Sequence, residues 1–169
     1  GDVLCFLCVR NESARLPHFL RHHRALGVRH FLVVDNASTD GTAQLLQGEP
    51  DVSLWQTSAS YKASRFGMDW LGWLQLRHGH EHWCLTLDAD ELLIYPYWQT
   101  RPLPALTDWL DQQGRRAFGA LTVDDVAGAL FAPDAPQALD RLRKRVLLAD
   151  EPGDEAPSAR GSPRLHAAQ

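Results

Sequence analysis

The chain has 169 residues, of which 44% are hydrophobic and 22% are charged, and its formal net charge is −4 at pH 7. These values are typical of one globular domain with a sizeable core. The slightly acidic balance and the lack of a basic cluster argue against nucleic acid as a partner.

No apolar run approaches the roughly 18 residues that a membrane span requires. The first residues also lack the basic region and the cleavage site of a signal peptide. We therefore expect a cytoplasmic protein without a transmembrane segment, for which contact with a membrane surface stays open.

Apolar runs alternate with amphipathic segments along most of the chain. Residues 3–9 are typical of a buried strand, and a helix with an apolar face follows and ends near Gly27. The face of that helix comprises Leu16, Phe19, Leu20, His23 and Leu26. Further strands are expected at 31–34, 52–56, 82–87 and 118–123, and further helices at 42–47, 61–77 and 103–113.

Two of these helices have specific sequence signals. A turn at 35–41 precedes the helix at 42–47, and Thr39 or Asp40 is suited to cap it. The helix at 61–77 is predicted from four apolar residues at helical spacing. These are Phe66, Trp70, Trp73 and Leu74.

The chain has three cysteines, an odd and low number that does not indicate a disulfide framework. Cys5 and Cys8 lie in the first expected strand, where positions three apart point to opposite faces. Packing thiols are therefore expected there rather than a redox pair.

The alternation of strands and helices predicts an α/β fold, a mostly parallel sheet with helices on both faces. Residues 1–124 are expected to form this domain. Residues 125–149 are expected to form a helical extension with a helix at 135–148, and residues 150–169 a disordered tail rich in alanine and proline.

Two acidic groups follow expected strands. Asp88 and Asp90 come after one apolar run, and Asp35 ends another. Ligands of open α/β sheets bind at the carboxyl ends of strands, so we expect these three carboxylates to converge on one cleft. The spacing of Asp88 and Asp90 places both on one side, as Mg²⁺ or Mn²⁺ requires for binding together with substrate phosphates.

Several motifs occur in a familiar order. They are Arg10-Asn11-Glu12, HHRALGV at 22–28, VDNASTDGT at 34–42 and LDADE at 87–91. Over residues 3–123 the chain resembles the family 2 glycosyltransferases, and most closely their bacterial branch with this motif pattern. The resemblance implies a glycosyltransferase A-type, Rossmann-like fold and a UDP-, GDP- or dTDP-linked sugar donor. It also implies Mn²⁺ or Mg²⁺, inversion at the anomeric carbon, and an unidentified glycan, lipid or protein acceptor.

The resemblance also implies roles for individual residues. Asp35 recognises the nucleotide base, Asp88 binds ribose or metal, and Asp90 binds the metal that bridges the diphosphate. The nucleotide pocket is lined by Val9, Arg10, Asn11 and Glu12, and the donor is contacted by Lys62 and Arg65. Asp124 and Asp125 are candidates for the catalytic base by location, and Glu91 is expected to support the site.

Alternatives remain at this stage. The resemblance fades near residue 123, so the acceptor-side part is expected to be reduced or missing, through a truncated or frame-shifted end. The chain would then be a non-catalytic nucleotide-sugar-binding remnant. A nucleotidyltransferase also uses paired carboxylates. The alternating His78, His80 and His82 fit a solvated loop better than a zinc or nickel site.

Overall fold

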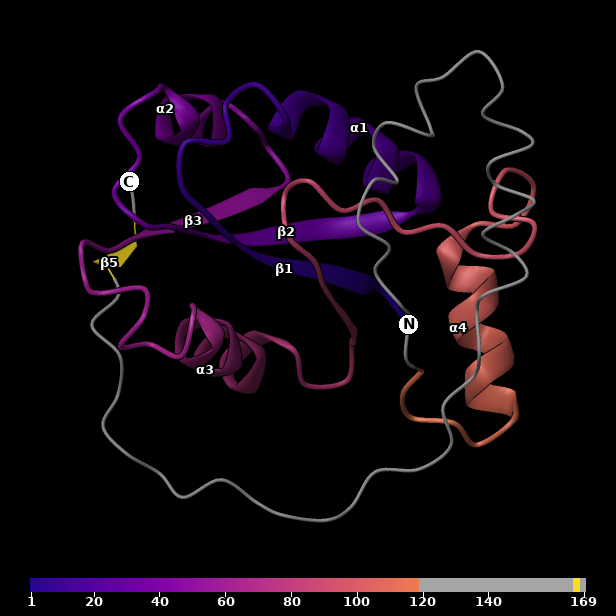
Figure 1. The fold of residues 1–169 in the computed structure, drawn as a ribbon. Helices are drawn as coiled ribbons and strands as arrows, with labels where there is room; N and C mark the ends of the chain where they lie inside the picture. The colour runs from indigo at the N-terminus through magenta and orange to yellow at the C-terminus, as the bar shows by residue number, and fades with distance from the viewer. Residues whose placement is uncertain (119–165, 168–169) are drawn as a thin grey trace.

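The computed structural model describes residues 1–118 and 166–167 (Figure 1). Four parallel strands form the body of one sheet, and helices cover both of its faces. The strands are β1 (Val3–Val9), β2 (Val28–Asp35), β3 (Val52–Gln56), β4 (Trp83–Thr86) and β5 (His166–Ala167), and the helices are α1 (Leu16–Leu26), α2 (Thr42–Gln47), α3 (Met68–His78) and α4 (Leu103–Gln112). The predicted mostly parallel sheet with helices on both faces is therefore confirmed.

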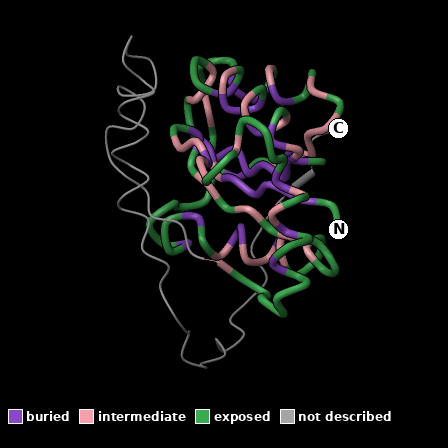
Figure 2. The backbone as a smooth tube through the Cα atoms, turned by 90° about the vertical axis from the view of Figure 1, so that its right-hand side faces the viewer, coloured by how far each residue is buried: buried purple, intermediate pink, exposed green. Residues whose placement is uncertain are grey.

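The strand order in the sheet is β4-β1-β2-β3-β5, and β5 pairs antiparallel with β3. Two apolar clusters pack against this sheet. Figure 2 shows the buried residues, in purple, concentrated along the middle of the molecule. One cluster joins the sheet to α1, α2 and α4, and the other joins it to α3. The alternation of side chains along β1 assigns Cys5 to the first cluster and Cys8 to the second, as the strand period predicts.

The apolar face predicted for α1 is confirmed, because all five of its residues are buried. Gly27 ends α1 with φ of 101°, a left-handed conformation that glycine adopts without strain. A Cβ atom at this position would lie 2.8 Å from Cδ of Pro104. Gly27 therefore also permits the end of α1 to pack directly against the start of α4.

The helix predicted over 61–77 begins seven residues late, at Met68, so the prediction is wrong for residues 61–67. Arg65, Phe66 and Gly67 have φ values of 51°, 57° and 81°, and a right-handed helix cannot pass through such a run. Phe66, expected on the buried face, is 63% exposed. Trp70 and Leu74 are buried as predicted.

Several predictions concern residues outside those described. They are the strand at 118–123 beyond Phe118, the candidate bases Asp124 and Asp125, the helix at 135–148, and the tail at 150–169 apart from β5. At His166–Ala167 the prediction of a disordered tail is wrong, because these residues pair with β3 as β5. Among the residues that the structure does describe, no helix has both the length and the apolar character to cross a membrane.

Candidate functional site

The loops that follow β1, β2 and β4 meet at one edge of the sheet. β2 lies on one side of β1 and β4 on the other, so the strand order reverses at β1. Ligands of open α/β sheets bind outside the carboxyl ends of the strands at such a point. A pocket of about 330 Å³ lies at these ends, within the range of roughly 300–1,000 Å³ that small-molecule sites occupy.

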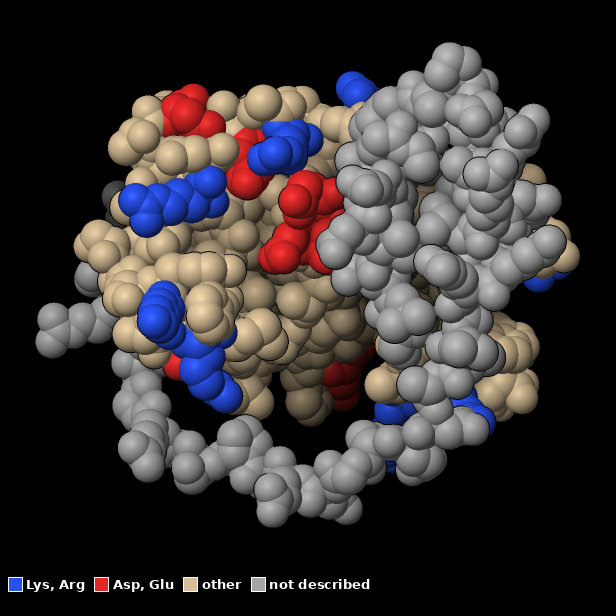
Figure 3. All heavy atoms as spheres, in the orientation of Figure 1, with Lys and Arg blue, Asp and Glu red and all other residues tan. Residues whose placement is uncertain are grey.

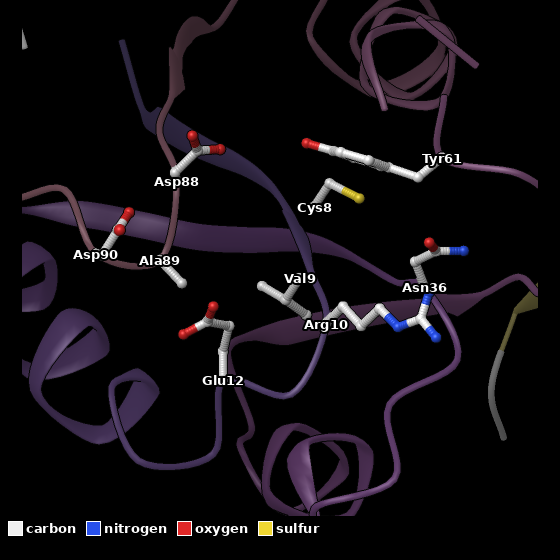
Figure 4. Close-up of a pocket in the computed structure, with 9 residues that line it drawn as sticks. All are labelled: Cys8, Val9, Arg10, Glu12, Asn36, Tyr61, Asp88, Ala89 and Asp90. Carbon is white, nitrogen blue, oxygen red and sulfur yellow. The ribbon is translucent and has the colours of Figure 1, made fainter. Parts of the chain in front are cut away.

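Nine residues line this pocket (Figure 4). They are Cys8, Val9, Arg10, Glu12, Asn36, Tyr61, Asp88, Ala89 and Asp90. Five of them, Val9, Arg10, Glu12, Asp88 and Asp90, were predicted site residues, and the structure brings these five together.

The acidic side of the pocket contains Glu12, Asp88 and Asp90. Figure 4 shows their carboxylates on neighbouring loops, and Figure 3 shows acidic side chains gathered near the middle of its view. Burial raises the pKa of Asp88, and the negative charges of Asp90 and Glu12 raise it further. The described residues form no ion pair with Asp88 or Asp90, whereas Glu12 pairs with Arg15 at 2.8 Å. Repulsion within this group would be relieved by a bound cation.

The protein side of such a cation site is incomplete. Across residues 1–118 and 166–167, no three His, Cys, Asp or Glu side chains are grouped so that they could hold a metal ion. Mg²⁺ and Mn²⁺ are commonly held by one or two carboxylates, with substrate phosphates and water as the remaining ligands. Asp88 and Asp90 fit that arrangement, and they fit a permanent metal site less well.

Asp35 does not join Asp88 and Asp90 in the pocket lining. Its buried carboxylate accepts hydrogen bonds from the Ser38 backbone N–H at 3.2 Å, from the Ser38 hydroxyl, and from Nε2 of Gln56 at 3.2 Å. These contacts fasten the loop after β2 to β3. The convergence of three carboxylates on one cleft is therefore found for Asp88 and Asp90, with Glu12 as the third member in place of Asp35.

Asn36, the next residue, lines the pocket and was overlooked by sequence reasoning. Its Nδ2 donates hydrogen bonds to the carbonyl oxygens of Thr57 at 3.1 Å and Ala59 at 3.0 Å. Both amide hydrogens are thus used, and this fixes the orientation of the side chain. Figure 4 shows Oδ1 on the side of Tyr61, where it is an acceptor for a ligand.

Hydrogen bonds join the segment that contains Asn11 and Glu12 to the VDNASTDGT segment at 34–42. Both segments contain residues predicted to bind the nucleotide. Oδ1 of Asn11 accepts from the Thr39 backbone N–H at 2.8 Å, and the hydroxyl of Thr42 accepts from the Glu12 backbone N–H at 2.9 Å. Asp40 accepts from the backbone N–H and the hydroxyl of Ser13. These hydrogen bonds lock the loop after β1 to the loop after β2. Asn11, a predicted pocket residue, does not line the pocket.

Asp40 also binds the start of α2, but the N-cap position predicted for Thr39 or Asp40 is occupied by Gly41. Asp40 accepts hydrogen bonds from the backbone N–H of Thr42 at 3.0 Å and from its hydroxyl at 2.6 Å. These bonds, with those from Ser13, hold the pKa of Asp40 below its usual range.

Lys62 and Arg65 do not line the pocket, although both were predicted to contact a donor. Arg65 pairs with Asp69 in the first turn of α3. Tyr61, from the same loop, does line it and was not predicted. Glu91 accepts from the backbone N–H of Asp88 at 2.9 Å, which agrees with the supporting role expected for it.

The histidines of the loop before β4 remain apart from the pocket. His78 ends α3, with its ring 5.5 Å from that of Trp55, and His80 is exposed. The loop predicted to contain all three histidines therefore begins only after His78, which belongs to α3.

Removal of the Asn36 amide tests how the pocket wall is held. We expect Asn36→Ala to lower the free energy of unfolding by about 2–3 kcal/mol, because two carbonyl oxygens lose their donors in a mostly buried place. Chemical denaturation followed by tryptophan fluorescence measures this change. Ser58→Ala, in the same loop, is the control, and an equal loss in both variants would contradict the role given to Asn36.

Comparison with known proteins adds no assignment. No protein-family model matches the chain, and no curated protein sequence matches it.

Proposed function

We propose that the chain is a metal-dependent glycosyltransferase of the family 2 type, and that the pocket binds the nucleoside diphosphate of a sugar donor. The observation that carries this proposal is the group formed by Asp88, Asp90 and Glu12 at the reversal of strand order. The order β3-β2-β1-β4 is that of the nucleotide-binding half of doubly wound sheets and is compatible with a glycosyltransferase A-type fold.

Asp88 and Asp90 would hold Mn²⁺ or Mg²⁺, which when bound neutralises charge on the departing diphosphate as a Lewis acid. Glu12, already paired with Arg15, adds to the negative field around that position. Burial and the charges of Asp90 and Glu12, which raise the pKa of Asp88, disfavour its ionised form, and a bound cation would favour that form.

The opposite end of the pocket offers polar groups for the nucleoside. Arg10 contributes guanidinium donors, and Asn36 contributes an acceptor whose orientation is fixed by the carbonyl oxygens of Thr57 and Ala59. A donor beside an acceptor is complementary to the –CO–NH– edge of uracil, thymine or guanine. This agrees with the UDP-, dTDP- or GDP-linked donors implied by the motifs. Reading of the base by Asp35 remains a prediction.

Transfer further requires a base that deprotonates the acceptor hydroxyl. Asp124 and Asp125 remain the proposed candidates for it. The reaction is proposed to invert the anomeric carbon, because the acceptor would attack from the face opposite the diphosphate.

A thermal-shift screen tests the proposal. A ligand that binds only the folded state raises the melting temperature. We expect a UDP-, dTDP- or GDP-sugar to raise it with Mn²⁺ and to have little effect with EDTA. A stronger response to nucleoside triphosphates would favour a nucleotidyltransferase. Binding without metal-dependent release of the nucleoside diphosphate would favour a non-catalytic module, and no response to any nucleotide would overturn the proposal.

A further inference from the structure

Tyr61 is the one aromatic side chain among the nine residues that line the pocket. It comes from the loop after β3 and is 41% exposed. Figure 4 shows its hydroxyl end on the side of Asp88 and its Cβ on the side of Asn36, so that the ring spans the space between the acidic group and the polar end. A ligand that occupies both ends must pass this ring.

The ring of Tyr61 is held in place by its own loop. The carbonyl oxygen of Tyr61 accepts hydrogen bonds from the Ser64 hydroxyl at 2.7 Å and from the Phe66 backbone N–H at 2.9 Å. The left-handed run at 65–67 turns the chain back, so the Phe66 ring meets the Tyr61 ring edge-on at 5.8 Å between centroids. A preformed aromatic surface loses little conformational freedom when a ligand binds.

Behind the ring lie buried groups that leave no room for it to withdraw. The ring of Trp70, which is 2% exposed, lies 6.3 Å from that of Tyr61. A Cβ atom at Gly67 would lie 3.0 Å from Cε2 of Tyr61 and 3.2 Å from Sγ of Cys8. Glycine at this position therefore permits the loop, the ring and the β1 strand end to pack closely.

Cys8 lies beside the ring as an uncharged surface. Burial, with the negative charges of Asp88 and Asp35, raises the pKa of its thiol to about 12, so the thiolate that a nucleophile requires is absent near neutral pH. The ring of Tyr61 and the thiol of Cys8 thus make an apolar area in a pocket that also contains Arg10, Asn36 and the acidic group.

We propose that Tyr61 is the stacking surface for the nucleobase of the donor. This inference rests on the proposed function, because it takes the pocket to bind a nucleoside diphosphate. The diphosphate belongs with the acidic group and its cation, and the transferred sugar lies beyond the diphosphate. The base is the planar part of such a ligand on the side of Arg10 and Asn36. Stacking on an aromatic side chain suits any base, because every base has a π-face.

The experiment measures binding of UDP and of inorganic pyrophosphate to the full chain by calorimetry in Mn²⁺. Tyr61→Leu should weaken UDP binding by about 5- to 50-fold and leave pyrophosphate binding within twofold, because pyrophosphate has no base to stack. Tyr61→Phe keeps the ring and should stay within twofold for both ligands. Phe66→Ala removes the edge support and should give a smaller loss for UDP alone.

Tyr97→Leu, which changes an exposed tyrosine outside the pocket, is the matched control and should bind both ligands as the unmodified chain does. Equal UDP affinity in Tyr61→Leu and the unmodified chain would overturn the stacking role and leave the proposed function standing. Equal losses for UDP and pyrophosphate would also overturn it, since they would show a general disturbance of the pocket. If the unmodified chain bound neither ligand, the proposed function would fail first.

Discussion

Replacing Asp90 with alanine is expected to weaken Mn²⁺-dependent binding of a nucleotide-sugar donor by at least about 100-fold. The carboxylates of Asp88 and Asp90 are the two that the proposed cation site provides, and loss of one leaves too few protein ligands to hold Mn²⁺ against water. Calorimetry with the donor in Mn²⁺ and in EDTA measures the effect. Binding in EDTA should change little, because the polar end of the pocket is intact.

Removal of the Asp90 charge has a second expected effect that involves no ligand. The negative charge of Asp90 is one cause of the raised pKa of Asp88, so Asp90→Asn should lower that pKa toward its ordinary value. An NMR titration of the Asp88 carboxyl would show it. Asp108→Asn, on the exposed surface of α4, is the control and should change neither quantity. Unchanged Mn²⁺-dependent affinity in Asp90→Ala would contradict the site assignment.

Acidification is expected to destabilise the protein through His23. Burial lowers the pKa of this fully enclosed side chain from 6.5 to about 4. Between pH 6.5 and about 4 the His23 side chain of the unfolded chain binds a proton, whereas that of the folded chain does not. The protein therefore has its full stability above about pH 6.5 and loses stability as the pH falls through this window. We expect the free energy of unfolding to fall by about 2 kcal/mol between pH 7.5 and pH 5 from this group.

The contacts of His23 explain why it stays neutral. Nδ1 donates to the carbonyl oxygen of Phe19 at 2.9 Å, and Nε2 accepts from the backbone N–H of Leu93 at 3.3 Å. His22, beside it, lies 3.0 Å from the carbonyl oxygen of Leu93 through Nε2. A proton on Nε2 of His23 would face the backbone N–H of Leu93, so repulsion between two N–H groups would replace the hydrogen bond. The two histidines therefore tie the segment after Asp90 to α1.

His23→Leu removes this acceptor and should lower stability at pH 7.5 by about 1–3 kcal/mol, because the Leu93 N–H is left buried and unpaired. It should also flatten the dependence of stability on pH between 7.5 and 5. His80→Leu, which changes an exposed histidine, should do neither. Urea denaturation at several pH values measures both effects, and an unchanged pH dependence in His23→Leu would show that another group is responsible.

The parts of the fold that local pattern determines were predictable. The buried face of α1 was found because amphipathic spacing alone decides which side of a helix meets the sheet. The start of α3 was missed because its apolar spacing begins at Phe66, which in the structure has a positive φ and donates its backbone N–H to the carbonyl oxygen of Tyr61 in the preceding loop. The spacing of apolar residues carries no information about a backbone conformation that depends on loop contacts.

The sequence indicated where in the fold the candidate site lies, but it indicated only some of the residues that line it. A strand that ends in a carboxylate marked the correct edge of the sheet at both Asp35 and Asp88. The alternation along β2, however, puts Asp35 on the side of Phe31 and Val33, and the next residue, Asn36, lines the pocket. Applied one residue further, that alternation is the signal that would have favoured Asn36. Tyr61 has no comparable signal, because a loop of irregular conformation brings it there.

The hydrogen bonds that join the loop after β1 to the loop after β2 have a consequence for variation among relatives of this chain. Ser13 gives both its backbone N–H and its hydroxyl to one carboxylate, that of Asp40. A change at Asp40 alone leaves the backbone N–H and the hydroxyl of Ser13 without this acceptor, so in an aligned set of homologues a change at position 40 should be accompanied by a change at position 13. A transplant of one loop into another scaffold should likewise succeed only when its companion is carried with it.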